Sequence, residues 1–135
     1  MNFAKKSLGQ NFLIDKNIIN KIVDLTSVYN RNIIEIGPGN GALTDEIIKR
    51  GPLSLSIIEK DFELFNKLRL KYSNNKKIKI YNKNILKFNI EKINKDNSII
   101  FGNLPYNISS QILVKILKFK KWPPNFFDLI FMFQK

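Results

Sequence analysis

Short apolar runs alternate along the chain with amphipathic stretches, a pattern typical of strands interleaved with helices. The apolar runs predict five strands, at residues 32–36, 53–59, 78–81, 98–102 and 127–133. The amphipathic stretches predict four helices, which begin after Asp15, at Ala42, after Asp61 and at Ser109 as an N-cap. Such alternation predicts an α/β fold with a doubly wound parallel sheet and right-handed crossovers.

The last predicted strand has no cover in the sequence that follows it. Residues 127–133 have the apolar character of a central strand, yet the sequence stops at Lys135. No internal repeat or low-complexity linker divides the chain. We therefore expect one domain over residues 1–135, cut before the last strands of its sheet.

Composition narrows the chemistry that this domain can perform. The chain has no cysteine and no histidine, which excludes a disulfide scaffold, a cysteine nucleophile and histidine-based acid–base catalysis, and we expect no metal site. No apolar run approaches the roughly 18 residues of a membrane span, and we expect a soluble protein of a reducing compartment. The net charge of +12 favours a polyanionic partner, although an A+T-rich genome would favour the same abundance of Lys and Asn.

A glycine-rich turn lies between the first predicted strand and its helix. Gly37 and Gly39 allow a tight turn and the close approach of a ligand, and Glu59 ends the next strand, where a carboxylate can accept both hydroxyls of a ribose. The spacing is G-x-G-x-G rather than the dinucleotide pattern G-x-G-x-x-G. It favours S-adenosylmethionine as the cofactor, with Glu35 near its positively charged end.

A second motif, Asn103-Leu104-Pro105-Tyr106, follows the fourth predicted strand and is placed beside the glycine turn. The side-chain oxygen of Asn103 and the carbonyl of Leu104 can accept hydrogen bonds from an exocyclic amine, which aims its lone pair at a methyl donor. Pro105 fixes the turn without adding an N–H group. Tyr106 offers a face for a flipped-out base. The motif predicts methylation of an amine such as adenine N6.

Four segments together resemble the ribosomal RNA adenine N6,N6-dimethyltransferases. They are residues 8–13 (Leu-Gly-Gln-Asn-Phe-Leu), 35–39 (Glu-Ile-Gly-Pro-Gly), 58–61 and 102–109 (Gly-Asn-Leu-Pro-Tyr-Asn-Ile-Ser). The resemblance covers nearly the whole chain. It implies a class I, Rossmann-like methyltransferase that uses S-adenosylmethionine to dimethylate two adjacent adenosines near the 3′ end of small-subunit ribosomal RNA, in the immature small subunit. It also implies a monomer that works in the cytoplasm or an organelle matrix.

The resemblance also implies roles for individual residues. Asn11 and Leu13 would border the cofactor, Gly37 and Gly39 would shape its loop, Glu59 would hold its ribose, Asn84 would contact its adenine, and Asn103 would lie between methyl donor and target amine. Two positions depart from the family pattern. Family members usually carry an aspartate at position 84, and Lys60 replaces a residue that is commonly apolar or acidic.

Other functions stay open on the sequence. The family continues well past Lys135, with further strands and a small helical domain, so a non-catalytic ribosome-assembly factor or a degenerate fragment of the enzyme is an alternative. Erythromycin-resistance methyltransferases share the second motif, but residues 8–13 fit the dimethyltransferases better. The loop spacing disfavours a nicotinamide-dependent oxidoreductase.

Six lysines are candidates for RNA contact, namely Lys5, Lys6, Lys115, Lys118, Lys120 and Lys121, the last four near Trp122.

Overall fold

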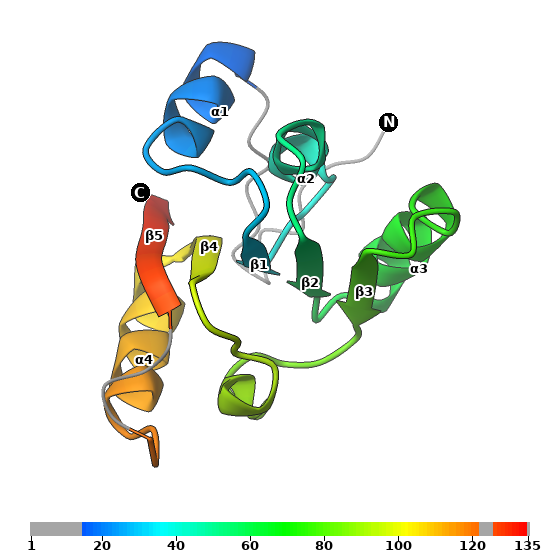
Figure 1. The fold of residues 1–135 in the computed structure, drawn as a ribbon. Coiled ribbons are helices and arrows are strands. Elements are labelled where there is room, and N and C mark those ends of the chain that lie inside the picture. Colours follow the sequence, from blue (N-terminus) through cyan, green and yellow to red (C-terminus); the bar gives the residue numbers. More distant parts are fainter. Residues whose placement is uncertain (1–14, 122–125, 135) are drawn as a thin grey trace.

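Five parallel strands form one sheet in the order β3-β2-β1-β4-β5 in the computed structural model, which describes residues 15–121 and 126–134 (Figure 1). The elements are α1 (Lys16–Val23), β1 (Asn32–Ile36), α2 (Ala42–Lys49), β2 (Ser54–Ile58), α3 (Phe62–Lys71), β3 (Ile78–Tyr81), the 3-10 helix η2 (Ile90–Lys92), β4 (Ser98–Pro105), α4 (Tyr106–Leu117) and β5 (Phe126–Gln134). The doubly wound parallel sheet predicted from the sequence is confirmed.

The sheet changes its direction of growth at β1. This strand pairs with β2 on one side and with β4 on the other, so that Ile36 lies opposite both Ile58 and Gly102. In open α/β sheets the crevice at such a switch point, at the carboxyl ends of the strands, is where ligands bind. Both sequence motifs therefore start at the same place, because one follows β1 and the other ends β4.

Alternating side chains of β1 divide the core into two apolar clusters, one on each face of the sheet. Ile33 joins the cluster covered by α1, α2 and α3, whereas Ile34 and Ile36 join the cluster covered by η2 and α4 (Figure 1). Each strand residue points to the face opposite its neighbour. Glu35 consequently points to the same face as Ile33, toward α2.

Acidic side chains start two of the helices as predicted. The Asp15 carboxylate accepts hydrogen bonds from the backbone N–H groups of Asn17 and Ile18, and the Asp61 carboxylate accepts one from Leu64. Both residues have extended backbone angles, the usual conformation of an N-cap.

The start of α4 differs from the sequence prediction. Strand β4 continues to Pro105 instead of ending at Gly102, because residues 103–105 pair with residues 132–134 of β5. The helix then begins at Tyr106, so the prediction of Ser109 as the N-cap is wrong. Ser109 instead lies on the buried face of α4, and its hydroxyl has no hydrogen-bond partner among the described residues. Pro105 ends the strand because it has no N–H group to donate to the strand pairing, and its fixed φ angle is compatible with the start of a helix.

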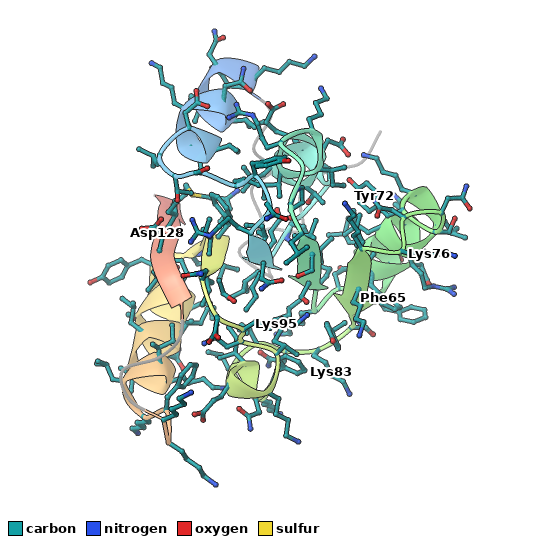
Figure 2. The ribbon with its side chains drawn as sticks, in the orientation of Figure 1. Phe65, Tyr72, Lys76, Lys83, Lys95 and Asp128 are labelled. Carbon is teal, nitrogen blue, oxygen red and sulfur yellow. The ribbon has the colours of Figure 1, made fainter. Side chains whose placement is uncertain are left out.

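Strand β5 also makes a contact outside its pairing with β4. Thr26, in the loop before β1, donates a hydrogen bond to the carboxylate of Asp128. Figure 2 shows where Asp128 lies on β5. Gly102 of β4 lies against Phe131, since a Cβ atom at position 102 would be 2.9 Å from the Phe131 ring. Within residues 15–121 and 126–134, no helix combines the length and the apolar character that crossing a bilayer requires.

Candidate active site

The glycine turn after β1 packs directly against the second motif. Gly37 and Gly39 have positive φ angles of 69° and 60°, a backbone conformation that residues other than glycine rarely adopt. A Cβ atom on Gly37 would lie 2.6 Å from Leu104 Cδ2, and the Gly37 N–H donates to the carbonyl of Ile58 over 3.0 Å. Gly37 is therefore the point where β1, β2 and the second motif meet.

Glu59 is held at the end of β2 by backbone N–H groups. Its side chain is 3% exposed, and Oε2 accepts a hydrogen bond of 2.8 Å from the Asp61 N–H. The N–H groups of Gly39 and Lys60 also donate to this carboxylate. Burial raises the pKa of Glu59, while these backbone donors act in the opposite direction. The result is a fixed acceptor beside the glycine turn, as holding a ribose requires.

Glu35 is a second buried acid, on the face of β1 covered by α2. It is 1% exposed, and Thr44 Oγ1 donates to its Oε1 over 2.6 Å. Burial raises the pKa of Glu35 to about 7, and the nearby Asp45 and Glu59 add to this effect. A cation close to Glu35 would favour its ionised form.

The segment after β3 is joined to the end of β2. Asn82 Nδ2 donates to the carbonyls of Glu59 and Lys60 over 3.0 and 3.1 Å. Two residues later, Asn84 Oδ1 accepts a hydrogen bond of 3.0 Å from the Leu86 N–H, which leaves this oxygen one further lone pair. The Asn82 side chain thus ties the segment that carries Asn84, the predicted adenine contact, to the main chain of Glu59, the predicted ribose acceptor. Lys60 is exposed, and nothing in the structure explains its departure from the family pattern.

The second motif is more open than the glycine turn. Asn103, Leu104 and Pro105 are half-buried, and they lie opposite Met132, Phe133 and Gln134 in the parallel β4–β5 pairing. Tyr106 is 66% exposed at the start of α4. The motif therefore presents an accessible aromatic ring beside polar atoms at the end of a rigid strand.

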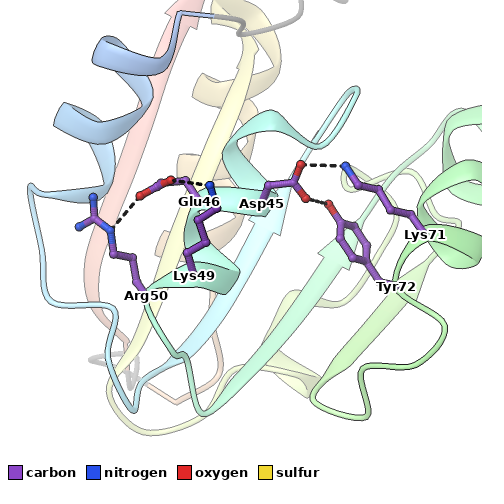
Figure 3. A network of polar contacts seen from close by, with 6 residues as sticks. All are labelled: Asp45, Glu46, Lys49, Arg50, Lys71 and Tyr72. Carbon is purple, nitrogen blue, oxygen red and sulfur yellow. Dashed lines mark hydrogen bonds and ion pairs between the residues drawn. The ribbon is translucent and has the colours of Figure 1, made fainter.

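A polar network that the sequence did not reveal holds α2 against α3. Asp45 accepts hydrogen bonds from Lys71 Nζ over 2.8 Å and from the Tyr72 hydroxyl over 2.5 Å (Figure 3). Burial makes the largest contribution to the raised pKa of Tyr72, and the hydrogen bond to Asp45 raises it further. A Cβ atom on Gly41 would be 3.0 Å from the Tyr72 hydroxyl, so α3 also limits the space beside the glycine turn. The only sequence signal is an acid in the first turn of α2, which is common.

The structure brings most of the predicted site residues together. Those at the carboxyl edge of the sheet are Gly37, Gly39, Glu59, Asn84, Asn103, Leu104, Pro105 and Tyr106. Asn11 and Leu13 lie outside the described residues, as do Lys5 and Lys6. The prediction that Lys115 contacts RNA is corrected, because its ammonium group donates hydrogen bonds to three main-chain carbonyls of the protein itself. Lys118, Lys120 and Lys121 are exposed.

Comparison with known proteins points to one family. A family model described as "Ribosomal RNA adenine dimethylase" matches residues 1–135. The chain is 46% identical, over 98% of its length, to the ribosomal RNA small subunit methyltransferase A of Pelagibacter ubique, and it covers 50% of that protein. It is 49% identical, over 85% of its length, to the protein of the same name from Mycoplasmopsis pulmonis, and it covers 44% of it. The chain thus spans about half the length of these relatives.

Solved structures share the architecture. The 23S rRNA methyltransferase ErmE has a TM-score of 0.71 and 28% identity, over 86% of this chain and 45% of ErmE. A dimethyladenosine transferase from Plasmodium falciparum has a TM-score of 0.74 and 24% identity, over 93% of this chain and 44% of that protein. At 24% identity, the second likeness is one of fold alone.

Proposed function

The chain belongs to the ribosomal RNA adenine dimethylase family, and we propose that it transfers methyl groups from S-adenosylmethionine to adenine N6. Its parallel sheet is that of the class I methyltransferases. We propose as substrates two adjacent adenosines near the 3′ end of small-subunit ribosomal RNA, in immature small subunits in the cytoplasm or an organelle matrix. The observation that carries the proposal is the contact between Gly37 and Leu104, which joins the cofactor turn to the amine-binding motif.

The residues around the glycine turn fit S-adenosylmethionine, which when bound supplies a methyl group from its sulfonium centre. Leu104 occupies the space beside Gly37 that a Cβ atom would need, so glycine at this position lets the turn pack closely against the second motif. Glu59 is fixed where it can accept ribose hydroxyl groups, and Asn84 lies on the segment linked to it. Glu35 adds a carboxyl group that a neighbouring cation would ionise. We propose that Asn11 and Leu13 complete the site.

The second motif fits an exocyclic amine. The Asn103 side-chain oxygen and the Leu104 carbonyl can each accept one amine N–H, which holds the nitrogen with its lone pair directed away from the ring plane. Tyr106 is exposed enough for a base to stack on its ring, an interaction worth about 1–3 kcal/mol. Neither contribution requires a histidine or a cysteine, and the chain has neither.

The excess of positive charge supports an RNA substrate. Each phosphate that a lysine neutralises releases counterions, so a net charge of +12 favours association with RNA. Lys118, Lys120 and Lys121 follow the end of α4 and are exposed. We propose that these three lysines contact the RNA backbone.

The decisive experiment is substitution of the residue placed between donor and amine. We expect Asn103→Ala to abolish methyl transfer to under-methylated small-subunit particles while the affinity for S-adenosylmethionine, measured by calorimetry, stays within a few-fold. Asn66→Ala, on α3 and distant in sequence from both motifs, is the control and keeps full transfer. Full activity of Asn103→Ala would exclude the proposed role. RNA binding by the unsubstituted chain without cofactor binding would instead favour a non-catalytic assembly factor.

A further inference from the structure

Lys115 has an unusual environment for a lysine on a surface helix. Its Nζ atom donates hydrogen bonds to the carbonyls of Ile85 and Leu86 over 3.0 Å each, and to that of Phe88 over 2.7 Å. An ammonium group has three donors, so all of them are used within the protein. Desolvation by burial lowers the pKa of Lys115. The lysine therefore serves the main chain of one segment, residues 85–88.

That segment is the one that carries Asn84. Asn84 Oδ1 accepts from the Leu86 N–H, the Asn84 carbonyl accepts from the Lys87 N–H over 2.9 Å, and these bonds fold the chain into a tight turn. Three carbonyl groups of this turn and the residues after it accept hydrogen bonds from the Lys115 ammonium group. The apolar side chains of the segment pack in the same cluster as Ile112 of α4. Lys115 thus adds directional hydrogen bonds to this apolar contact.

The other end of α4 bears the amine-binding motif. The helix begins at Tyr106, directly after Pro105, and Lys115 lies in its last turn. A second contact joins the same two regions. The Glu91 carboxylate, in η2, accepts hydrogen bonds from the backbone N–H groups of Lys120 and Lys121 over 3.2 and 3.0 Å. The connection between β3 and β4 is consequently bonded both to α4 and to the segment that directly follows it.

We propose that Lys115 is a positioning residue that holds the Asn84 turn against α4 and so sets the adenine-binding part of the cofactor site in register with the target motif. The proposal rests on the function proposed above, since it assigns the Asn84 turn to the cofactor's adenine. Charge alone does not perform this role. A compact ammonium group can serve three carbonyls around one point, whereas the donors of a guanidinium lie in one plane.

The test compares two ligands on the whole chain, S-adenosylhomocysteine and S-inosylhomocysteine, which has an oxygen in place of the adenine amino group. We expect Lys115→Met to weaken S-adenosylhomocysteine binding about tenfold, the effect of losing charge-assisted hydrogen bonds, and to weaken S-inosylhomocysteine binding much less. A general loss of stability would weaken both alike. Lys67→Met, an equal change of charge on the outside of α3, is the control and leaves both dissociation constants unchanged.

Amide hydrogen exchange provides a measurement that needs no ligand. We expect Lys115→Met to accelerate exchange at residues 86–88, whose N–H groups bond within the turn, and Lys67→Met to leave it unchanged. If Lys115→Met does not fold, Lys115→Arg serves in its place, with the same expected loss of base selectivity. Unchanged selectivity in Lys115→Arg would overturn the proposal, because charge would then suffice.

The outcomes separate this proposal from the one on which it rests. If the unsubstituted chain binds S-adenosylhomocysteine and Lys115→Met keeps both its affinity and its selectivity within twofold, the positioning role is wrong and the proposed function stands. Faster exchange without any change in selectivity has the same meaning. If the unsubstituted chain does not bind S-adenosylhomocysteine, the proposed function fails first, and the role of Lys115 fails with it.

Discussion

The two halves of the candidate site are built in different ways. Around β1 and β2 the side chains that we propose to face the cofactor are buried acids, with Glu35 1% and Glu59 3% exposed, and each accepts a hydrogen bond from a specific donor. Around β4 the residues that we propose to face the target are half-buried, and Tyr106 is largely exposed. A small cofactor can be enclosed by groups fixed before it arrives, whereas a base on a large RNA needs an open approach.

Gly37 joins these halves, and its substitution is expected to have the largest effect. In Gly37→Ala the left-handed conformation costs about 1–2 kcal/mol, and the new Cβ atom displaces Leu104, since the two would be 2.6 Å apart. Both halves are then disturbed at once. We expect methyl transfer to fall about a hundredfold, as misplacement of reacting groups by about 1 Å can do, in single-turnover assays.

Gly51→Ala is the matched control for this substitution. Gly51 also has a positive φ angle, of 70°, but its Cβ atom would meet only the Tyr29 ring, at 3.3 Å. We expect a comparable loss of thermal stability with no change in the rate of the chemical step. Equal losses of rate in both variants would mean that Gly37 acts through stability alone.

The next largest effect concerns the buried half and depends on pH. The pKa of Glu35 is raised to about 7 in the folded protein, so its contribution to stability is fully present below the unfolded value near 4.5 and is lost as the pH rises through 7. Glu35→Gln removes this ionisation. We expect the variant to gain up to about 3 kcal/mol of unfolding free energy at pH 8 relative to the unsubstituted chain, and much less at pH 5.

The same substitution, Glu35→Gln, is expected to weaken cofactor binding although it increases stability. If Glu35 neighbours the cationic end of the cofactor, calorimetry will show weaker S-adenosylmethionine binding by Glu35→Gln at pH 8 despite its greater stability. For the unsubstituted chain, affinity should rise between pH 6 and 8 as the carboxyl group ionises. A variant that is more stable and binds equally well would show that Glu35 serves only the contact with Thr44.

The smallest effect concerns the open half. Tyr106→Ala removes a stacking face worth about 1–3 kcal/mol, so we expect roughly a tenfold higher KM for small-subunit particles. Its exposure predicts little change in thermal stability. Tyr106→Phe keeps the ring and should retain the KM of the unsubstituted chain. A Phe variant as impaired as the Ala variant would assign the role to the hydroxyl group rather than to stacking.

Local features of this molecule could be predicted from the sequence, and features that depend on distant partners could not. The five strands, the caps at Asp15 and Asp61 and the turn at Gly37 follow from hydrophobic period, capping chemistry and glycine spacing. Ser109 was misplaced because a serine before an apolar stretch resembles an N-cap. What overrides that signal is the pairing of residues 103–105 with β5, which no local pattern reports.

The roles of lysines were also beyond sequence reasoning. Lys115 lies in the last turn of α4, and Lys118, three positions later, is its C-cap residue. The two side chains have the same chemistry, yet the Lys115 ammonium group donates to the main chain of another segment whereas Lys118 is exposed. The difference arises from where η2 and the Asn84 turn lie, and so from the course of the chain between β3 and β4. Likewise, the contact of Asp45 with Tyr72 depends on how α2 packs on α3.

The pairing of β1 with β4 also matters for how the protein reaches its native state. It joins Ile33 to Ile99, the widest sequence separation of any strand pairing described, whereas β1 with β2 and β2 with β3 are near neighbours along the chain. Closing a long loop costs more chain entropy than closing a short one, and such contacts form slowly. The cofactor half can therefore assemble early, during synthesis, while the step that completes the site is the one that the folding chain reaches late.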